Sequence, residues 1–266
     1  MDVTEVTNVM YLEYLDWLKR NRSMDVYLGA IPDTLVWRNK LGYAEDMVNN
    51  YLRNPAYANY PVVGVKWIQA TEYAEWRSDR YQELILEKEG FIVRDAKLDS
   101  VNNNSTFNID TYVINPNESY GGNQEILRGK RSRTPDSLAP STANRESGYI
   151  SPKFRLPTES EWEYAARSGS ADPDLVSAGP AFWTPNGGGG IPSSMGYSCS
   201  SSFLLDDGTD FQSLAVYCLY GFNQTFAVAQ KIPNDFGLYD MIGNAREWVN
   251  DIYDSSLGTF DVTDPI

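Results

Sequence analysis

Aromatic residues interleaved with turn-forming residues limit the folds that this chain can adopt. The 266 residues include 18 Tyr and 7 Trp, together with 20 Gly and 14 Pro. Chains that combine many large rings with many residues that break regular elements form irregular, loop-rich folds rather than helical bundles. We therefore expect few helices, short strands and extensive loops.

The length of the chain bounds the number of domains. A chain of 266 residues builds one large domain with a sizeable core, or at most two small ones. No internal repeat and no clean interdomain linker stand out in the sequence. We predict a single domain over residues 1–266, interrupted by two long, loop-rich insertions at about 95–150 and 169–230, and insertions of this length are usually functional or mobile.

Hydrophobic periodicity predicts two well-defined helices. The first follows a cap at Thr7 or Asn8 and continues with apolar residues at helical spacing to about Arg20. The second is long and covers about Ile68–Glu89, with Gly90 as its natural stop.

Weaker signals predict the remaining regular elements. A short helix is expected near Glu45–Leu52, and a capping box formed by Thr158 and Glu161 marks the start of another helix. Short strands are expected at residues 2–6 and 106–113.

The acidic charge limits the classes of partner. The formal net charge is -14, whereas nucleic-acid binding requires a concentrated basic surface. The same charge argues against docking of the protein's own surface on an anionic membrane. No apolar run approaches the roughly 20 residues that a membrane-spanning helix requires. Met1 leads directly into a strand and a helix cap, so we expect the chain to begin inside a domain, as a fragment.

The absence of histidine excludes several kinds of active site. With no histidine in the chain, neither a Ser-His-Asp or Cys-His arrangement nor a His-ligated metal site is available. Catalysis would have to use carboxylates, Lys, Tyr or Cys. Cys199 and Cys218 form no Cys-x-x-Cys motif. They are a candidate disulfide if their Cα atoms lie within about 7 Å, and two buried free thiols are the alternative.

Four segments carry a resemblance to a known family. They are, in chain order, Glu5-Val-Thr-Asn8, Pro61–Trp67, Arg155–Arg167 and Asn234–Trp248. Their order and residue types resemble the formylglycine-generating-enzyme, or sulfatase-modifying-factor, domain family. The resemblance implies an α+β fold that is a variant of the C-type lectin fold.

Other segments resemble one branch of that family, the gliding-motility lipoproteins of the GldJ type. They are Tyr11–Lys19, Pro32–Asn39, Asn49–Tyr57 and Glu87–Gly90, and a GldK-type relative is the alternative. This resemblance implies a non-catalytic component of the type IX secretion and gliding machinery that works with the ring formed by GldK and GldN. It also implies an outer-membrane lipoprotein on the periplasmic face, held to the membrane only through a lipid anchor outside this chain.

The sequence departs from the family's enzymes at the catalytic cysteines. The enzymes place a cysteine pair after the Gly-Asn-x-x-Glu-Trp motif, beside an Arg-Gly-Gly-Ser-x-Trp segment. Cys199 and Cys218 precede the motif and do not match those positions. We therefore expect no enzymatic activity, and we expect the family's last strands to lie beyond Ile266, so that the domain is incomplete at its C-terminus.

The motif loop suggests a calcium site. The resemblance implies that the loop with Asn244 and Glu247 contributes to Ca²⁺ binding. A hard cation prefers carboxylate, amide and carbonyl oxygens, and Gly243 permits a sharp backbone path. The alternative is that both side chains hydrogen-bond the backbone and fix the turn. The acidic run Leu205–Asp210 lacks the spacing of an EF-hand and is interpreted as a solvated turn.

Two other functions remain open. One is a sulfatase-modifying oxidase whose catalytic C-terminal part is absent from the sequence, and a downstream cysteine pair would favour it. The other is a calcium-dependent, lectin-like ligand-binding protein, for which glycan binding would require the metal and would be lost in Asn244→Ala.

Overall fold

The computed structural model of the protein describes residues 1–38, 44–93, 106–122, 124–127, 142–166, 225–241 and 243–251. The chain divides into two compact units, and each is described by itself. Unit 1 comprises Met1–Tyr11, Pro32–Gly64 and Leu156–Ile266, and unit 2 comprises Leu12–Ile31 and Val65–Arg155. Each unit is thus built from segments that are distant in the sequence.

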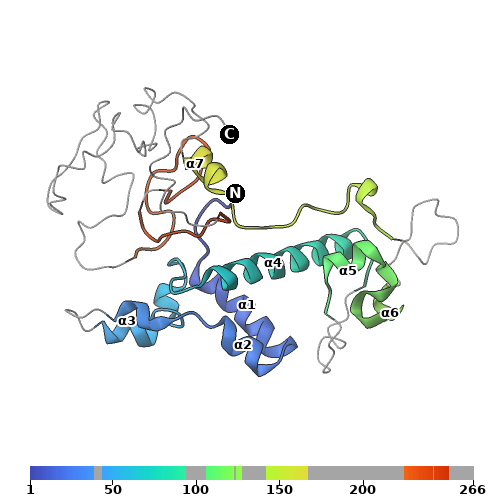
Figure 1. Ribbon diagram of the computed structural model, residues 1–266, viewed down its shortest axis with the longest axis horizontal. Coiled ribbons are helices and arrows are strands. Elements are labelled where there is room, and N and C mark those ends of the chain that lie inside the picture. The colour runs from blue at the N-terminus through green and yellow to red at the C-terminus, as the bar shows by residue number, and fades with distance from the viewer. Residues whose placement is uncertain are drawn as a thin grey trace. The chain divides into compact units, whose positions relative to one another are not determined.

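Helices are the regular elements of the described residues (Figure 1). The α-helices and 3₁₀-helices are α1 (Asn8–Asn21), α2 (Met24–Ala30), η1 (Thr34–Trp37), α3 (Glu45–Asn50), η2 (Pro55–Tyr57), α4 (Trp67–Lys88), α5 (Ile109–Ile114), η3 (Pro116–Gly122), α6 (Gln124–Leu127), η5 (Arg145–Ser147) and α7 (Glu159–Ala166). An isolated antiparallel bridge joins Thr7 and Pro61. No extended strand is defined in these ranges, so the strand content of the expected α+β fold stays a prediction. Within the same ranges, no helix has the length and apolar character that crossing a membrane requires.

The predicted helix ends are confirmed where capping residues mark them. The hydroxyl of Thr7 accepts a hydrogen bond from the amide of Met10 at the start of α1. At α7, the amide of Glu161 donates to the Thr158 hydroxyl at 3.2 Å, and the amide of Thr158 donates to the Glu161 carboxylate at 2.9 Å. Gly90 follows α4 with a φ of 79°, a left-handed conformation that glycine adopts without strain.

The strand predicted at residues 106–113 is wrong, because this segment contains helix α5. The side chain of Asn108 caps the helix by accepting a hydrogen bond from the amide of Thr111 at 3.0 Å. The carboxylate of Asp79, on α4, accepts another from the amide of Ile109 at 2.8 Å. A residue that is distant in the sequence therefore satisfies the first turn of the helix, and local β-propensity does not decide the outcome.

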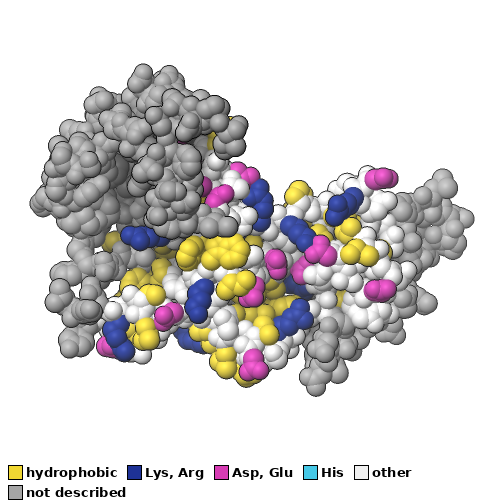
Figure 2. Space-filling model, viewed as in Figure 1, with side chains coloured by type: hydrophobic (Ala, Val, Ile, Leu, Met, Phe, Trp, Pro, Cys, Tyr) yellow, Lys and Arg dark blue, Asp and Glu magenta, His cyan; other side chains and the backbone are white. Residues whose placement is uncertain are grey.

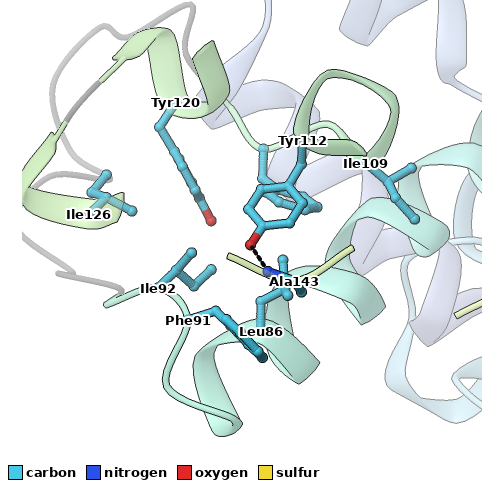
Figure 3. Close-up of a cluster of buried hydrophobic side chains, with 9 residues drawn as sticks. Leu86, Phe91, Ile92, Ile109, Tyr112, Tyr120, Ile126 and Ala143 are labelled. Atoms are coloured by element: carbon cyan, nitrogen blue, oxygen red, sulfur yellow. Dashed lines mark hydrogen bonds between the residues drawn. The ribbon is translucent and has the colours of Figure 1, made fainter. Parts of the chain in front are cut away.

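Unit 2 contains a hydrophobic cluster at the C-terminal end of α4 (Figure 3). Its buried members are Leu86, Phe91, Ile92, Phe107, Ile109, Tyr112, Tyr120, Ile126 and Ala143. Most of them come from the range 95–150, the first of the two predicted insertions. In Figure 1, α5 lies beside the C-terminal half of α4. The described parts of this range, 106–122, 124–127 and 142–150, therefore contribute to the packed interior.

Aromatic rings pack α1 against α4 in unit 2. The ring of Tyr14 lies 5.6 Å from that of Tyr73 and 5.2 Å from that of Trp76, and the guanidinium of Arg80 lies 4.9 Å above the ring of Trp17. Arg80 also forms an ion pair with Glu83 at 2.6 Å. On the described part of the face in Figure 2, charged side chains are scattered among groups of hydrophobic ones.

Two side chains of α4 hold a non-helical segment of the chain in place. The side chain of Gln82 donates to the carbonyl of Tyr149 and accepts from the amide of Ser151, both at 2.8 Å. One turn earlier, the hydroxyl of Ser78 accepts from the amide of Phe154 at 2.8 Å. These bonds satisfy backbone groups that have no sheet ladder to join.

We predict that Gln82→Ala destabilises unit 2 by about 1–3 kcal/mol, because two half-buried backbone groups lose their partner. Native-state hydrogen exchange is expected to accelerate at the amide of Ser151. The control is Leu84→Ala on the same helix, where the side chain is 56% exposed. Equal effects of the two substitutions on the midpoint of denaturant unfolding would contradict this role of Gln82.

Candidate functional site

Segments that resemble the family motifs meet within unit 1. The carboxylate of Glu5 accepts hydrogen bonds from the side-chain amide of Asn244 at 2.7 Å and from the backbone amide of Ala245 at 2.8 Å. Glu5 is only 7% exposed. The first and last motif segments are therefore joined by two hydrogen bonds to a buried side chain.

The side chain of Asn244 fixes the motif loop from the other side as well. Its oxygen accepts from the amide of Phe226 at 2.9 Å, and its nitrogen also donates to the carbonyl of Phe226 at 3.2 Å. Asn244 has a φ of 54° and Gly243 a φ of 92°. Both residue types tolerate this left-handed region, which explains why Gly-Asn stands at the turn.

Trp162 joins the α7 segment to the same loop. Its indole nitrogen donates to the carboxylate of Glu247 at 2.5 Å. Two more hydrogen bonds join the same segments. The amide of Asn250 donates to the carbonyl of Pro157 at 2.8 Å, and the amide of Glu159 donates to the carboxylate of Asp251 at 2.5 Å. The motif tryptophan of α7 thus contacts the motif glutamate through a hydrogen bond.

Asn234, the first residue of the last motif segment, fixes the turn that follows it. Its side-chain oxygen accepts from the amides of Phe236 and Leu238, both at 3.0 Å, and its nitrogen donates to the carbonyl of Ala165 at 2.8 Å. The bond to Ala165 satisfies a carbonyl in the last turn of α7. A buried asparagine before Asp-Phe-Gly is typical of such a turn, and this pattern is the signal that a sequence-based search could have used.

Three carboxyl groups lie close enough to influence one another. Burial raises the pKa of Glu5 from 4.5 to about 8; the Ala245 amide opposes this effect, and the Glu247 and Asp240 carboxylates add to it. Burial also raises the pKa of Asp240, against the bond from the Ala229 amide and the charge of Lys231. At neutral pH, the structure therefore favours a protonated Glu5.

Glu247 and Asp240 have different surroundings. Glu247 is exposed, and desolvation by the surrounding protein nevertheless raises the pKa of its carboxyl group. The hydrogen bond from Trp162 opposes this effect, and the charge of Asp240 adds to it. One oxygen of Asp240 accepts from the amide of Ala229 at 2.7 Å. The other is buried and has no hydrogen-bond partner among the described residues. The sequence did not identify Asp240 as a site residue.

The predicted calcium residues lie on one loop, and both bind protein donors. Asn244 accepts from Phe226, and Glu247 accepts from Trp162. In the part of the chain that the structure describes, no three Asp, Glu or Cys side chains are arranged as a metal site. The hydrogen-bonding role expected as the alternative is present for both side chains, and calcium binding stays a prediction.

Other candidate residues lie outside the described ranges. They include the disulfide candidates Cys199 and Cys218 and the acidic run Leu205–Asp210. Their pairing and environment stay predictions.

Comparison with known proteins identifies the family. The family described as "Sulfatase-modifying factor enzyme 1-like domain" matches residues 1–263. The chain belongs to this family. The match covers all four motif segments, including Glu5 and Asn244, and the fold family is that of the C-type lectin-like domains.

Individual relatives give less information than the family does. The chain is 31% identical to "Chaperone protein LppX" of Paenibacillus barcinonensis over 105 residues. The matched stretch is 36% of this chain and 30% of that protein, so the chain spans about a third of the relative's length. No solved structure matches the chain.

We predict that Glu5→Gln reduces the pH dependence of stability. The pKa of Glu5 is about 8 in the folded state and near 4.5 when unfolded. Its contribution is therefore fully present below pH 4.5 and is lost as the pH rises through 8. The loss is on the order of a few kcal/mol, because each pKa unit corresponds to about 1.4 kcal/mol.

The measurement is denaturant unfolding at pH values from 4.5 to 9. The stability of the wild type relative to Glu5→Gln is expected to fall across this range. The control is Glu13→Gln, at an exposed position of α1. A constant difference between wild type and Glu5→Gln would contradict the raised pKa.

Proposed function

We propose that the chain is a non-catalytic, protein-binding domain of the type IX secretion and gliding machinery. One observation carries this proposal: the motif side chains of Glu5, Asn244, Glu247 and Trp162 are bonded to one another and to the backbone. In this arrangement the motifs stabilise loops. A rigid framework that presents long loops is typical of recognition domains.

The choice of machinery rests on the resemblance to the GldJ branch. The segments Tyr11–Lys19, Pro32–Asn39, Asn49–Tyr57 and Glu87–Gly90 support it. A GldK-type relative is the alternative within the same machinery. The proposed location is the periplasmic face of the outer membrane, with attachment through a lipid anchor outside this chain.

Two further observations are consistent with a role in protein binding. The relative with 31% identity is described as a chaperone protein, a class of protein that acts on other proteins. The chain has no histidine, so the acid–base and metal-ligand chemistry of that side chain is excluded. The family also contains enzymes, and a sulfatase-modifying oxidase is therefore the competing proposal.

Calcium is a proposed ligand of the motif loop. Glu247 and Asn244 each retain an oxygen lone pair besides the one that accepts from Trp162 or Phe226. Calcium bound there would add rigidity to a loop that hydrogen bonds already fix. A calcium-dependent, lectin-like protein would combine this site with metal-dependent glycan binding.

We predict that the native full-length protein co-purifies from its own membranes with a ring of the GldK–GldN type. The measurement is mass spectrometry after affinity capture in mild detergent, compared with capture of an unrelated outer-membrane lipoprotein. Recovery of the ring proteins at defined stoichiometry is the expected result. Recovery of the protein alone, or with a sulfatase-like client, would contradict the proposal.

A further inference from the structure

Two aromatic rings of unit 1 are in contact with each other and with solvent. The rings of Tyr164, on α7, and Phe236 have centroids 5.7 Å apart. Tyr164 is 61% exposed and Phe236 is 49% exposed. Exposed rings of this size contribute strongly to an interface when a partner covers them.

The segments that carry these rings are held together by the hydrogen bonds described above. The side chain of Asn234 donates to the carbonyl of Ala165, next to Tyr164, and accepts from the amide of Phe236. The two rings are therefore positioned by a buried asparagine that contacts both segments. Such positioning lowers the entropy lost when a partner binds.

The described segments of unit 1 that carry the two rings are rich in carboxylates. Glu161 lies one turn before Tyr164 on the same side of α7, and Asp235 precedes Phe236; both are exposed. Across residues 156–166, 225–241 and 243–251, carboxylates outnumber basic side chains. The carboxylates are Glu159, Glu161, Glu163, Asp235, Asp240, Glu247 and Asp251, and the basic side chains are Lys231 and Arg246.

Exposed rings flanked by carboxylates match the chemistry of arginine. A guanidinium stacks on an aromatic face and at the same time forms paired hydrogen bonds with a carboxylate, whereas the compact ammonium of lysine does this less well. We propose that Tyr164, Phe236 and Asp235 form a docking surface for an arginine-rich segment of a partner protein, with the capping carboxylate of Glu161 adding negative charge. This inference rests on the protein-binding role proposed above and specifies the chemistry of the partner.

The test measures binding of two synthetic peptides to the full chain by fluorescence anisotropy at physiological salt. One peptide contains four Arg-Gly repeats, and the other contains four Lys-Gly repeats with the same charge. The wild type is expected to bind the arginine peptide about tenfold more tightly than the lysine peptide. Equal affinities, or no binding of either peptide, would overturn the proposal.

Two double variants test whether the two rings form the binding surface for arginine. Tyr164→Leu/Phe236→Leu keeps apolar bulk, and therefore folding, but removes both rings, so the preference for arginine is expected to disappear. The control is Leu35→Ala/Val36→Ala, which removes two side chains of η1 that are 53% and 54% exposed, and the preference is expected to remain. An unchanged preference in the leucine variant would overturn the proposal.

The peptide test and the co-purification test fail independently. If the native protein recovers its partners while the leucine variant retains the preference for arginine, the protein-binding role stands and this surface is wrong. If the peptide result is as expected and no partner is recovered from membranes, the surface stands and the proposed machinery is wrong.

Discussion

The buried contact between the Glu5 carboxylate and the motif loop is the interaction on which unit 1 depends. Asn244 and Ala245, its donors, lie 239 and 240 residues further along the chain. Closing a loop of that length costs entropy, and the buried hydrogen bonds of Glu5 offset part of this cost. The contact places Asn244 in the left-handed conformation in which its amide also satisfies the backbone of Phe226. The remaining motif hydrogen bonds, from Trp162 to Glu247 and from Asn234 to Ala165, join α7 to the segment Asn234–Trp248.

Side-chain bonds to the backbone also organise unit 2. Gln82, Ser78 and Asp79 are consecutive or nearly so on α4, and each satisfies backbone groups of a segment that returns from elsewhere in the chain. A loop-rich chain must pair its buried amides and carbonyls without long ladders. Polar side chains on a long helix meet this requirement, while the cluster around Leu86 and Phe91 supplies the apolar burial. In both units, therefore, polar side chains satisfy backbone groups, although the residues that do so differ.

The sequence predicted the parts of the fold that depend on local signals. The caps at Thr7 and Thr158 located the starts of α1 and α7, and Gly90 located the end of α4. The segment around Ile109 was predicted wrongly as a strand, because Asp79, 30 residues earlier, completes the first turn of its helix. Asn244 and Glu247 were singled out from the motif, but their bonds to Glu5 and Trp162 are long-range contacts that no local pattern specifies.

The central claim is that hydrogen bonds between the family motif residues stabilise the fold of unit 1. A double-mutant cycle of Glu5→Ala and Asn244→Gly tests it directly, since glycine tolerates the φ of 54° at residue 244. Denaturant unfolding of the wild type, both single variants and the double variant gives the coupling free energy. This stabilising role predicts a coupling free energy of about 1–3 kcal/mol between the two substitutions. Effects that add to within about 0.5 kcal/mol would contradict it.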